Sequence, residues 1–278
     1  MTSTPDASLP QHRIVAIKYA DRAARRPEHF IGGDPHDEPM DMDYFVWAVI
    51  GPERIWVVDT GFDRVDAEQR QRNLIRTAAE GLALIDIDAT SVTDVVLTHL
   101  HYDHVGGFAQ FPAARFHVQD AEMAYATGRH MTWPAIRHAY TADHVAQLVH
   151  LVYGDRVVFH DGDVELAPGL SLHHIGGHTM GLQVVRVSTA VGHVVLASDA
   201  NHYYENAEGR PFPIVHDVGA MLAGHERCRA LATHPSFVVP GHDPLVFERY
   251  PAVPGLEGIA VAVDGAPLLD GAASGIGA

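Results

Sequence analysis

The chain has 278 residues, 47% of them hydrophobic and 19% charged, a balance typical of a folded globular protein rather than a disordered or coiled-coil chain. Nineteen lysines and arginines stand against 35 aspartates and glutamates, and the formal charge of −16 repels phosphate backbones, which argues against a nucleic-acid partner. The single cysteine, Cys228, excludes an intramolecular disulfide and a cysteine-rich zinc module.

The first ten residues carry neither the basic stretch nor the apolar stretch of a secretory signal. No run of about 18 apolar residues is present to span a membrane. We therefore expect a cytoplasmic protein without a membrane partner.

The first half of the chain interleaves strand-like and helix-like segments, which favours an α/β fold. Gly51-Pro52 separates two apolar runs and predicts a hairpin between them. Strands are predicted at 13–20, 44–50, 54–58, 94–98 and 115–118, and helices at 66–79, from Asp120 onward and at 141–152.

The second half repeats this organisation and predicts a second sheet packed on the first, with helices outside. Strands are predicted at 156–159, 164–166, 170–175, 182–187, 193–197 and 236–239, and a helix at 218–232. No composition break marks a linker, so residues 1–264 are predicted to form one domain. Residues 21–42 are predicted to be a long irregular connection on the substrate side, and the small-residue tail 265–278 is expected to be poorly ordered.

The most informative segment is Thr98-His99-Leu100-His101-Tyr102-Asp103-His104-Val105-Gly106-Gly107. It follows an apolar strand, where side chains can converge on a ligand. Imidazole and carboxylate are ligands that zinc, manganese and iron(II) accept. The Gly-Gly pair is predicted to let the backbone pass close to the metals without a Cβ clash.

Three further segments place the same residue types just after strands. These are Gly176-Gly177-His178-Thr179, Ser198-Asp199 and Pro240-Gly241-His242-Asp243. Together with the first segment they supply five histidines and two aspartates, enough for two cations that share one carboxylate. A single histidine at any of these places would more often be a surface or core residue, so the argument depends on the set.

With these segments in order, the chain from Asp59 to His242 resembles the metallo-β-lactamase superfamily, whose members are αββα sandwiches of two mixed sheets with a dinuclear metal site. The resemblance implies that His99, His101 and His178 hold the first metal. It further implies that Asp103, His104 and His242 hold the second metal and that Asp199 bridges the two. Asp59-Thr60-Gly61 matches an element of the family in which the aspartate supports the ligands from behind.

The same resemblance implies hydrolysis by a hydroxide that bridges two divalent metal ions, with Asp103 moving the proton to the leaving group. Zinc is the metal expected first, and iron, cobalt or manganese are alternatives. Oxidoreductases of the family carry a glutamate where His101 stands, so histidine here favours a hydrolase.

Within the family, the segments DYFVWAVI, VVDTGFD, THLHYDHVGG, ASDANHYYEN and PGHDPLVFERYP resemble the N-acyl homoserine lactonase branch. Many lactonases place a tyrosine three residues after the bridging aspartate, where its hydroxyl assists at the substrate carbonyl. Here that position is His202, followed by Tyr203 and Tyr204, and any of the three is a candidate for this role.

The implied substrate is a lactone, N-acyl homoserine lactone above all, and a homodimer is compatible with the resemblance. Two alternatives stay open: a hydrolase of another ester, thioester or cyclic amide, and a metal-binding protein without turnover. An acyl chain would need an apolar pocket. The candidates for its walls are Phe30, Met40, Met42, Phe62, Met131, Trp133 and Ile136.

Overall fold

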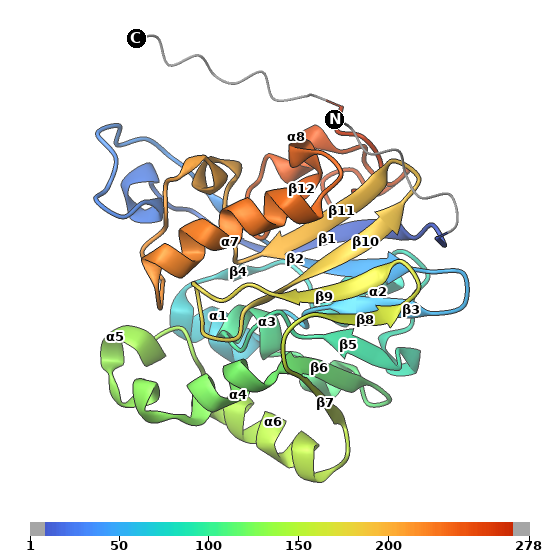
Figure 1. The fold of residues 1–278 in the computed structure, drawn as a ribbon, viewed down its shortest axis with the longest axis horizontal. Helices are drawn as coiled ribbons and strands as arrows, with labels where there is room; N and C mark the ends of the chain where they lie inside the picture. The colour runs from blue at the N-terminus through green and yellow to red at the C-terminus, as the bar shows by residue number, and fades with distance from the viewer. Residues whose placement is uncertain (1–8, 269–278) are drawn as a thin grey trace.

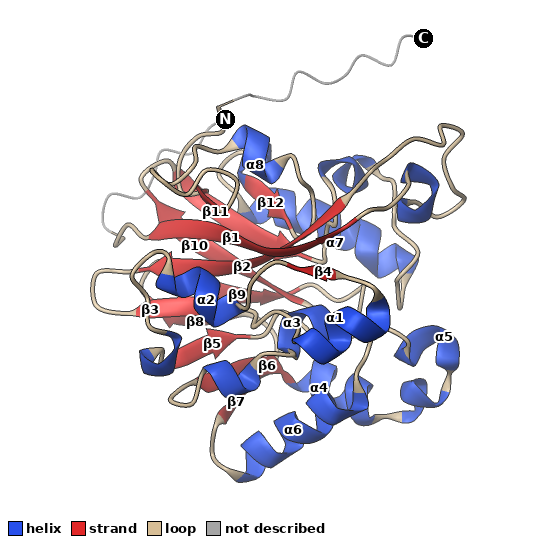
Figure 2. Ribbon diagram, turned by 180° about the vertical axis from the view of Figure 1, so that it is seen from behind, coloured by secondary structure: helices blue, strands red, loops and turns tan. Residues whose placement is uncertain are grey.

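The computed structural model describes residues 9–268 of the chain. Two β-sheets pack face to face, and helices cover the outer face of each sheet (Figures 1 and 2). Both sheets contain parallel and antiparallel neighbours. The predicted αββα sandwich of two mixed sheets is confirmed.

The first sheet has eight strands, antiparallel at one side and parallel at the other. The Gly51-Pro52 turn joins β2 (Met42–Ile50) to β3 (Ile55–Val58) in a hairpin, in which Trp47 pairs with Val58. The strands in spatial order are β13 (Ala260–Ala262), β1 (Arg13–Arg22), β2 (Met42–Ile50), β3 (Ile55–Val58), β5 (Asp94–Val96), β6 (Arg115–Gln119) and β7 (Val157–His160), with β4 (Asn73–Leu74) pairing beside β1.

The second sheet has five strands. Its strands in spatial order are β12 (Val238–Pro240), β11 (Gly192–Ser198), β10 (Gln183–Thr189), β9 (Leu170–His174) and β8 (Val164–Ala167). Within residues 9–268, β11 and β12 form the one parallel pair of this sheet, so the segments after these two strands leave the sheet at the same edge.

The helices are α1 (Arg64–Arg70), α2 (Ala78–Ala83), α3 (Tyr102–Val105), α4 (Asp120–Thr127), α5 (Pro134–Arg137), α6 (Ala142–Tyr153), α7 (Val218–Leu231) and α8 (Val246–Arg249). Helix α7 covers the second sheet (Figure 1), whereas α1 and α2 cover the first (Figure 2). Among the helices between residues 9 and 268, none combines the length and apolarity needed to cross a membrane.

The alternation of side chains along the strands divides the apolar core into layers. On β1, Ile14 and Ala16 face the core between the two sheets, while Val15 and Ile17 face the core under the helices of the first sheet. A third core lies between the second sheet and α7, where Cys228 is fully buried. Cys228 therefore acts as a small apolar residue.

The single helix predicted at 66–79 is wrong. Helix α1 ends at Arg70 because Gln71 adopts a left-handed conformation with φ of +55°. The next residues form β4, which pairs with β1, and Thr77 then caps α2 through a reciprocal pair of hydrogen bonds with Glu80. Strand pairing with a distant segment has overridden a helix-like pattern.

The connection predicted at 21–42 is shorter, because β1 continues through Arg22 and β2 begins at Met42. Between them lie a 3₁₀ helix at Arg26–His29 and a bridge from Arg25 to Pro39. Of the predicted tail, only 265–268 is described, and residues 269–278 lie outside the described range.

The glycine pair Gly106-Gly107 follows α3, and its packing differs from the prediction. A Cβ on Gly106 would lie 2.8 Å from the Cα of Phe62, and one on Gly107 would lie 2.3 Å from the carbonyl oxygen of Thr60. Both glycines therefore allow a close approach to the turn after β3. That contact holds α3, which carries two predicted ligands, against the strand end.

Candidate metal centre

The predicted metal ligands leave several strand ends and converge on one buried place. His99 follows β5, His178 follows β9, Asp199 follows β11, and His242 follows β12. His101 caps α3, which carries the remaining two ligands, Asp103 and His104. All seven residues are buried, with at most 9% of the residue surface exposed.

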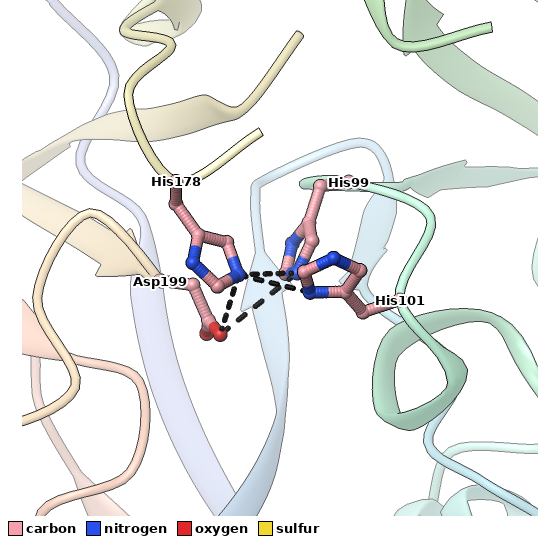
Figure 3. Close-up of side chains that lie close together, drawn as sticks. All are labelled: His99, His101, His178 and Asp199. Carbon is pink, nitrogen blue, oxygen red and sulfur yellow. Dashed lines mark hydrogen bonds and ion pairs between the residues drawn. The ribbon is translucent and has the colours of Figure 1, made fainter. Parts of the chain in front are cut away.

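One group consists of His99, His101, His178 and Asp199, whose ligand atoms all lie within 4.8 Å of one another. Nε2 of His178 lies 3.2 Å from Nε2 of His99 and 2.9 Å from Nδ1 of His101. Figure 3 shows the three imidazoles and the carboxylate pointing towards one another. These nitrogens face a common centre, as ligands of one cation would.

The other group consists of Asp103, His104 and His242. Oδ2 of Asp103 lies 3.7 Å from Nε2 of His104 and 3.8 Å from Nε2 of His242. The division of the ligands into these two groups is the one that the family resemblance implies.

Asp199 lies between the two groups, and each of its oxygens faces a different one. Oδ2 is 3.2 Å from Nε2 of His178, whereas Oδ1 is 3.0 Å from Nε2 of His242 and 3.4 Å from Nε2 of His104. A carboxylate placed in this way can bridge two cations. The preceding residue, Ser198, has a φ of +44°, a strained conformation of the kind found at functional sites.

Hydrogen bonds on the outer side of the imidazoles fix their orientation. Nδ1 of His104 donates to Asp59 Oδ2 at 2.7 Å, and Nδ1 of His178 donates to the Ile214 carbonyl at 2.6 Å. Nδ1 of His242 donates to the Asp43 carbonyl at 2.8 Å. In each case the other nitrogen, Nε2, is turned to the centre, which is how metal-binding histidines are held in proteins.

The protonation state of the first group fits a metal. Burial and the neighbouring imidazoles hold the pKa values of His99 and His101 well below the usual range. Both rings are therefore neutral, the form that binds metals. In the second group, Nε2 of His104 is buried and makes no hydrogen bond. Such an atom is costly without a partner, and a cation would supply one.

Of the three residues considered for the carbonyl-assisting role, the structure places His202 beside the ligands. Its Nε2 donates to Asp199 Oδ2 at 2.8 Å, and its ring stacks on Phe212 at 3.6 Å between centroids. Burial lowers the pKa of His202 to about 3. His202 also lies within ligand distance of Asp199 and His242, so binding a metal is a second role open to it.

The two tyrosines point elsewhere. The hydroxyl of Tyr203 is buried next to Nε2 of His29 at 3.1 Å and donates to the Asp41 carbonyl at 3.2 Å. The Tyr204 ring packs under the guanidinium of Arg249 at 3.8 Å. Neither tyrosine lines the cavity over the metal ligands.

A cavity of about 210 Å³ opens over the ligands. Of the seven residues considered for an apolar wall, Met42 lines it and the other six do not. Phe62 is buried against Tyr19, Tyr44 and Tyr102, whereas Trp133 is 64% exposed. Phe30 packs under the guanidinium of Arg210. The remaining three, Met40, Met131 and Ile136, are partly buried at the edge of the core under the helices of the first sheet.

Several residues that line the cavity were not predicted by the sequence analysis. Apolar contacts come from Phe212, Pro213 and Ile214, a segment without a regular pattern. Polar contacts come from Arg22, Glu28, His29, Tyr44, Arg70, Arg72, Tyr102 and His138. Tyr44 and Tyr102 lie in segments noted for other reasons, and no motif marks the rest, since they meet only when β1, the loop after it, α1 and the segment before α6 are folded together.

Comparison with known proteins identifies the family. The model of the metallo-beta-lactamase superfamily matches residues 42–242. An N-acyl homoserine lactonase of a Bacillus species is 33% identical over 120 residues, which cover 42% of this chain and 42% of that protein. The aligned part thus spans less than half of the relative.

Two solved structures have the same fold. One, a quorum-quenching N-acyl homoserine lactone lactonase, has a TM-score of 0.70 at 21% identity and covers 88% of this chain and 95% of its own. Another, a dizinc quorum-quenching lactonase in complex with a product, has a TM-score of 0.67 at 18% identity and covers 85% of this chain and 89% of its own. With the family model matched from the start of β2 to His242, this chain belongs to the metallo-beta-lactamase superfamily, and its predicted ligands form the two buried groups described above.

Proposed function

We propose that this protein is a dinuclear metal-dependent hydrolase that opens a lactone ring, with N-acyl homoserine lactones as the first substrates to test. The observation that carries the proposal is the position of Asp199, whose two oxygens face two separate groups of buried ligands. Five imidazoles and two carboxylates are a donor set that suits two zinc ions.

Two bound divalent cations would lower the pKa of a water and polarise a substrate carbonyl. Asp103 lines the cavity, where its carboxylate can take a proton from the attacking water and deliver it to the ring oxygen as that atom leaves. His202 also lines the cavity, and its neutral ring has one hydrogen, which bonds to Asp199 Oδ2 here. With metals bound to that carboxylate, this hydrogen could be donated instead to the carbonyl oxygen, on which negative charge develops.

The lactonase relatives support a lactone substrate, and the seven ligands support turnover. Two alternatives have less support. A hydrolase of another ester, thioester or cyclic amide would use the same ligands, since the fold does not dictate the substrate. A metal-binding protein without turnover would not need an accessible cavity over the ligands, and this chain has one.

The proposal is tested by kinetics on zinc-loaded protein with N-acyl homoserine lactones of short and long acyl chain, simple lactones, thioesters and a β-lactam. We expect the highest kcat/KM on a lactone. A higher kcat/KM on the thioester or the β-lactam would mean that this compound class, and not a lactone, is the substrate. No turnover of any compound, with both metals bound, would favour the non-catalytic alternative.

We expect two metal ions per chain, because the ligands form two groups around a shared carboxylate. The measurement is elemental analysis of protein purified without chelator and then saturated with zinc or cobalt. A single ion per chain at saturation would contradict the dinuclear assignment.

A further inference from the structure

The cavity over the ligands is lined by three guanidinium groups, from Arg22, Arg70 and Arg72. This is unexpected in a chain whose formal charge is −16. The carboxylates among the described lining residues are Glu28, Asp103 and Asp199, and the last two are metal ligands. With the metals bound, the cavity is therefore a positively charged pocket in an acidic protein.

Two of the three arginines are already engaged. Arg70 stacks over the ring of Tyr102 at 3.9 Å, donates to the His138 carbonyl at 2.7 Å, and lies 3.6 Å from Asp66. Arg22 pairs with Glu28 at 3.0 Å, although its Nε is buried without a hydrogen-bond partner. Their positive charges are thus partly balanced within the protein.

Arg72 differs, because none of the ion pairs found between residues 9 and 268 includes it. It is held by two uncharged groups, since its Nε donates to the hydroxyl of Tyr102 at 3.0 Å and one terminal nitrogen donates to the Arg70 carbonyl at 2.6 Å. The Asp103 carboxylate attracts this charge without forming an ion pair with it, and a partly buried guanidinium without a paired carboxylate is costly. The same planar group binds a carboxylate through paired hydrogen bonds.

Arg72 is close to the metal ligands through a short chain of side chains. The hydroxyl of Tyr102 lies 3.4 Å from that of Tyr44, and the Tyr44 ring meets the His242 ring edge-on at 5.1 Å. A substrate that contacts both Arg72 and the second group of ligands must therefore be short. A cavity of about 210 Å³ is small for a binding site and favours a compact substrate.

We propose that Arg72, assisted by Arg22, binds a carboxylate of the substrate, so that the preferred substrates are compact lactones or esters that carry a free carboxylate. This inference rests on the proposed hydrolytic function. Water adds to the ring carbonyl carbon and the acyl C–O bond breaks. The ring oxygen leaves as an alcohol after taking a proton, and the new acid releases one. The product is a hydroxy dicarboxylate.

The test compares two lactones of nearly equal size, 5-oxotetrahydrofuran-2-carboxylate and its carboxamide, on the zinc-loaded protein. We expect kcat/KM to favour the carboxylate at least about tenfold, as for a hydrogen bond to a charged group. Arg72→Gln should reduce this preference about tenfold or more, mainly through KM. Arg72→Lys should restore part of it, since the charge is kept and the paired geometry is lost.

The matched control is Arg64→Gln, which removes the same charge from the exposed side of α1, outside the cavity, and should keep the wild-type preference. Melting temperature and zinc content are measured for each variant. If Arg72→Gln does not fold, Arg72→Lys and Arg22→Gln carry the test, and each should lower the preference.

Equal kcat/KM for the two lactones in the wild type, or a preference unchanged in the Arg72 variants, would overturn this inference and leave lactone hydrolysis standing. If the wild type hydrolyses no lactone, the proposed function fails by itself. Calorimetric titration with the same two lactones then still tests whether Arg72 binds the carboxylate. Tighter binding of the carboxylate that is lost in Arg72→Gln supports the inference, and equal binding of both compounds contradicts it.

Discussion

Replacing Asp199 by alanine is expected to remove most of the bound metal and to lower kcat/KM at least ~10³-fold. Each oxygen of this carboxylate faces a different group of ligands, so one substitution takes a ligand from both. It also removes one of two negative charges that balance the cations, which leaves Asp103 and five imidazoles as ligands. Elemental analysis and steady-state kinetics on the best lactone measure the two effects.

The control for this substitution is Asp161→Ala. Asp161 is exposed in the turn before β8 and does not line the cavity, so the variant removes the same charge without touching the ligands. It should keep two metals and wild-type kinetics. If Asp199→Ala also kept both metals and lost less than about tenfold in kcat/KM, Asp199 would not be the bridging ligand.

The sequence predicts the ligand-bearing strand ends well, because residues of metal-ligand type directly follow apolar runs that form strands. The apolar run before His99 is a buried strand, and the apolar run before Asp199 is another. A buried strand must end where polar side chains can leave the core, so ligand-type residues after such runs meet at one edge. This local rule finds His99, His178, Asp199 and His242, whereas His101, Asp103 and His104 lie at the start of α3 and on it, and the spacing of the motif after His99 identifies them.

The residues around the ligands could not be predicted in the same way. Arg72 lies in a segment that looks helical, and it faces the cavity only because Gln71 ends α1 and β4 pairs with β1. That pairing joins residues about fifty positions apart, which local periodicity cannot show. The apolar candidates failed for a related reason, since Met and aromatic side chains in loops pack wherever a neighbouring element leaves room, as Phe62 does against Tyr44.

His202 lies where a side chain could assist at the substrate carbonyl. As a lactone ring opens, negative charge grows on its carbonyl oxygen, and a hydrogen-bond donor aimed at that oxygen is worth about 3 kcal/mol, or roughly 10²-fold in rate. His202 lines the cavity, and the stacking on Phe212 and the bond to Asp199 fix its ring. Tyr203 and Tyr204 are turned away from the cavity, so their hydroxyls cannot supply this donor without a rearrangement.

We therefore expect His202→Ala to lose about 10²-fold in kcat while keeping two metals, and Tyr204→Phe to stay close to the wild type. Tyr203→Phe is expected to have a smaller effect than His202→Ala, because its hydroxyl contacts His29, which lines the cavity. The measurements are kcat on the best lactone and metal content for each variant. Loss of one metal in His202→Ala would instead indicate that His202 binds a metal together with Asp199 and His242, since the three lie within ligand distance of one another. Wild-type kcat in all three variants would leave no donor role for any of these side chains, and polarisation of the carbonyl would then depend on the metals.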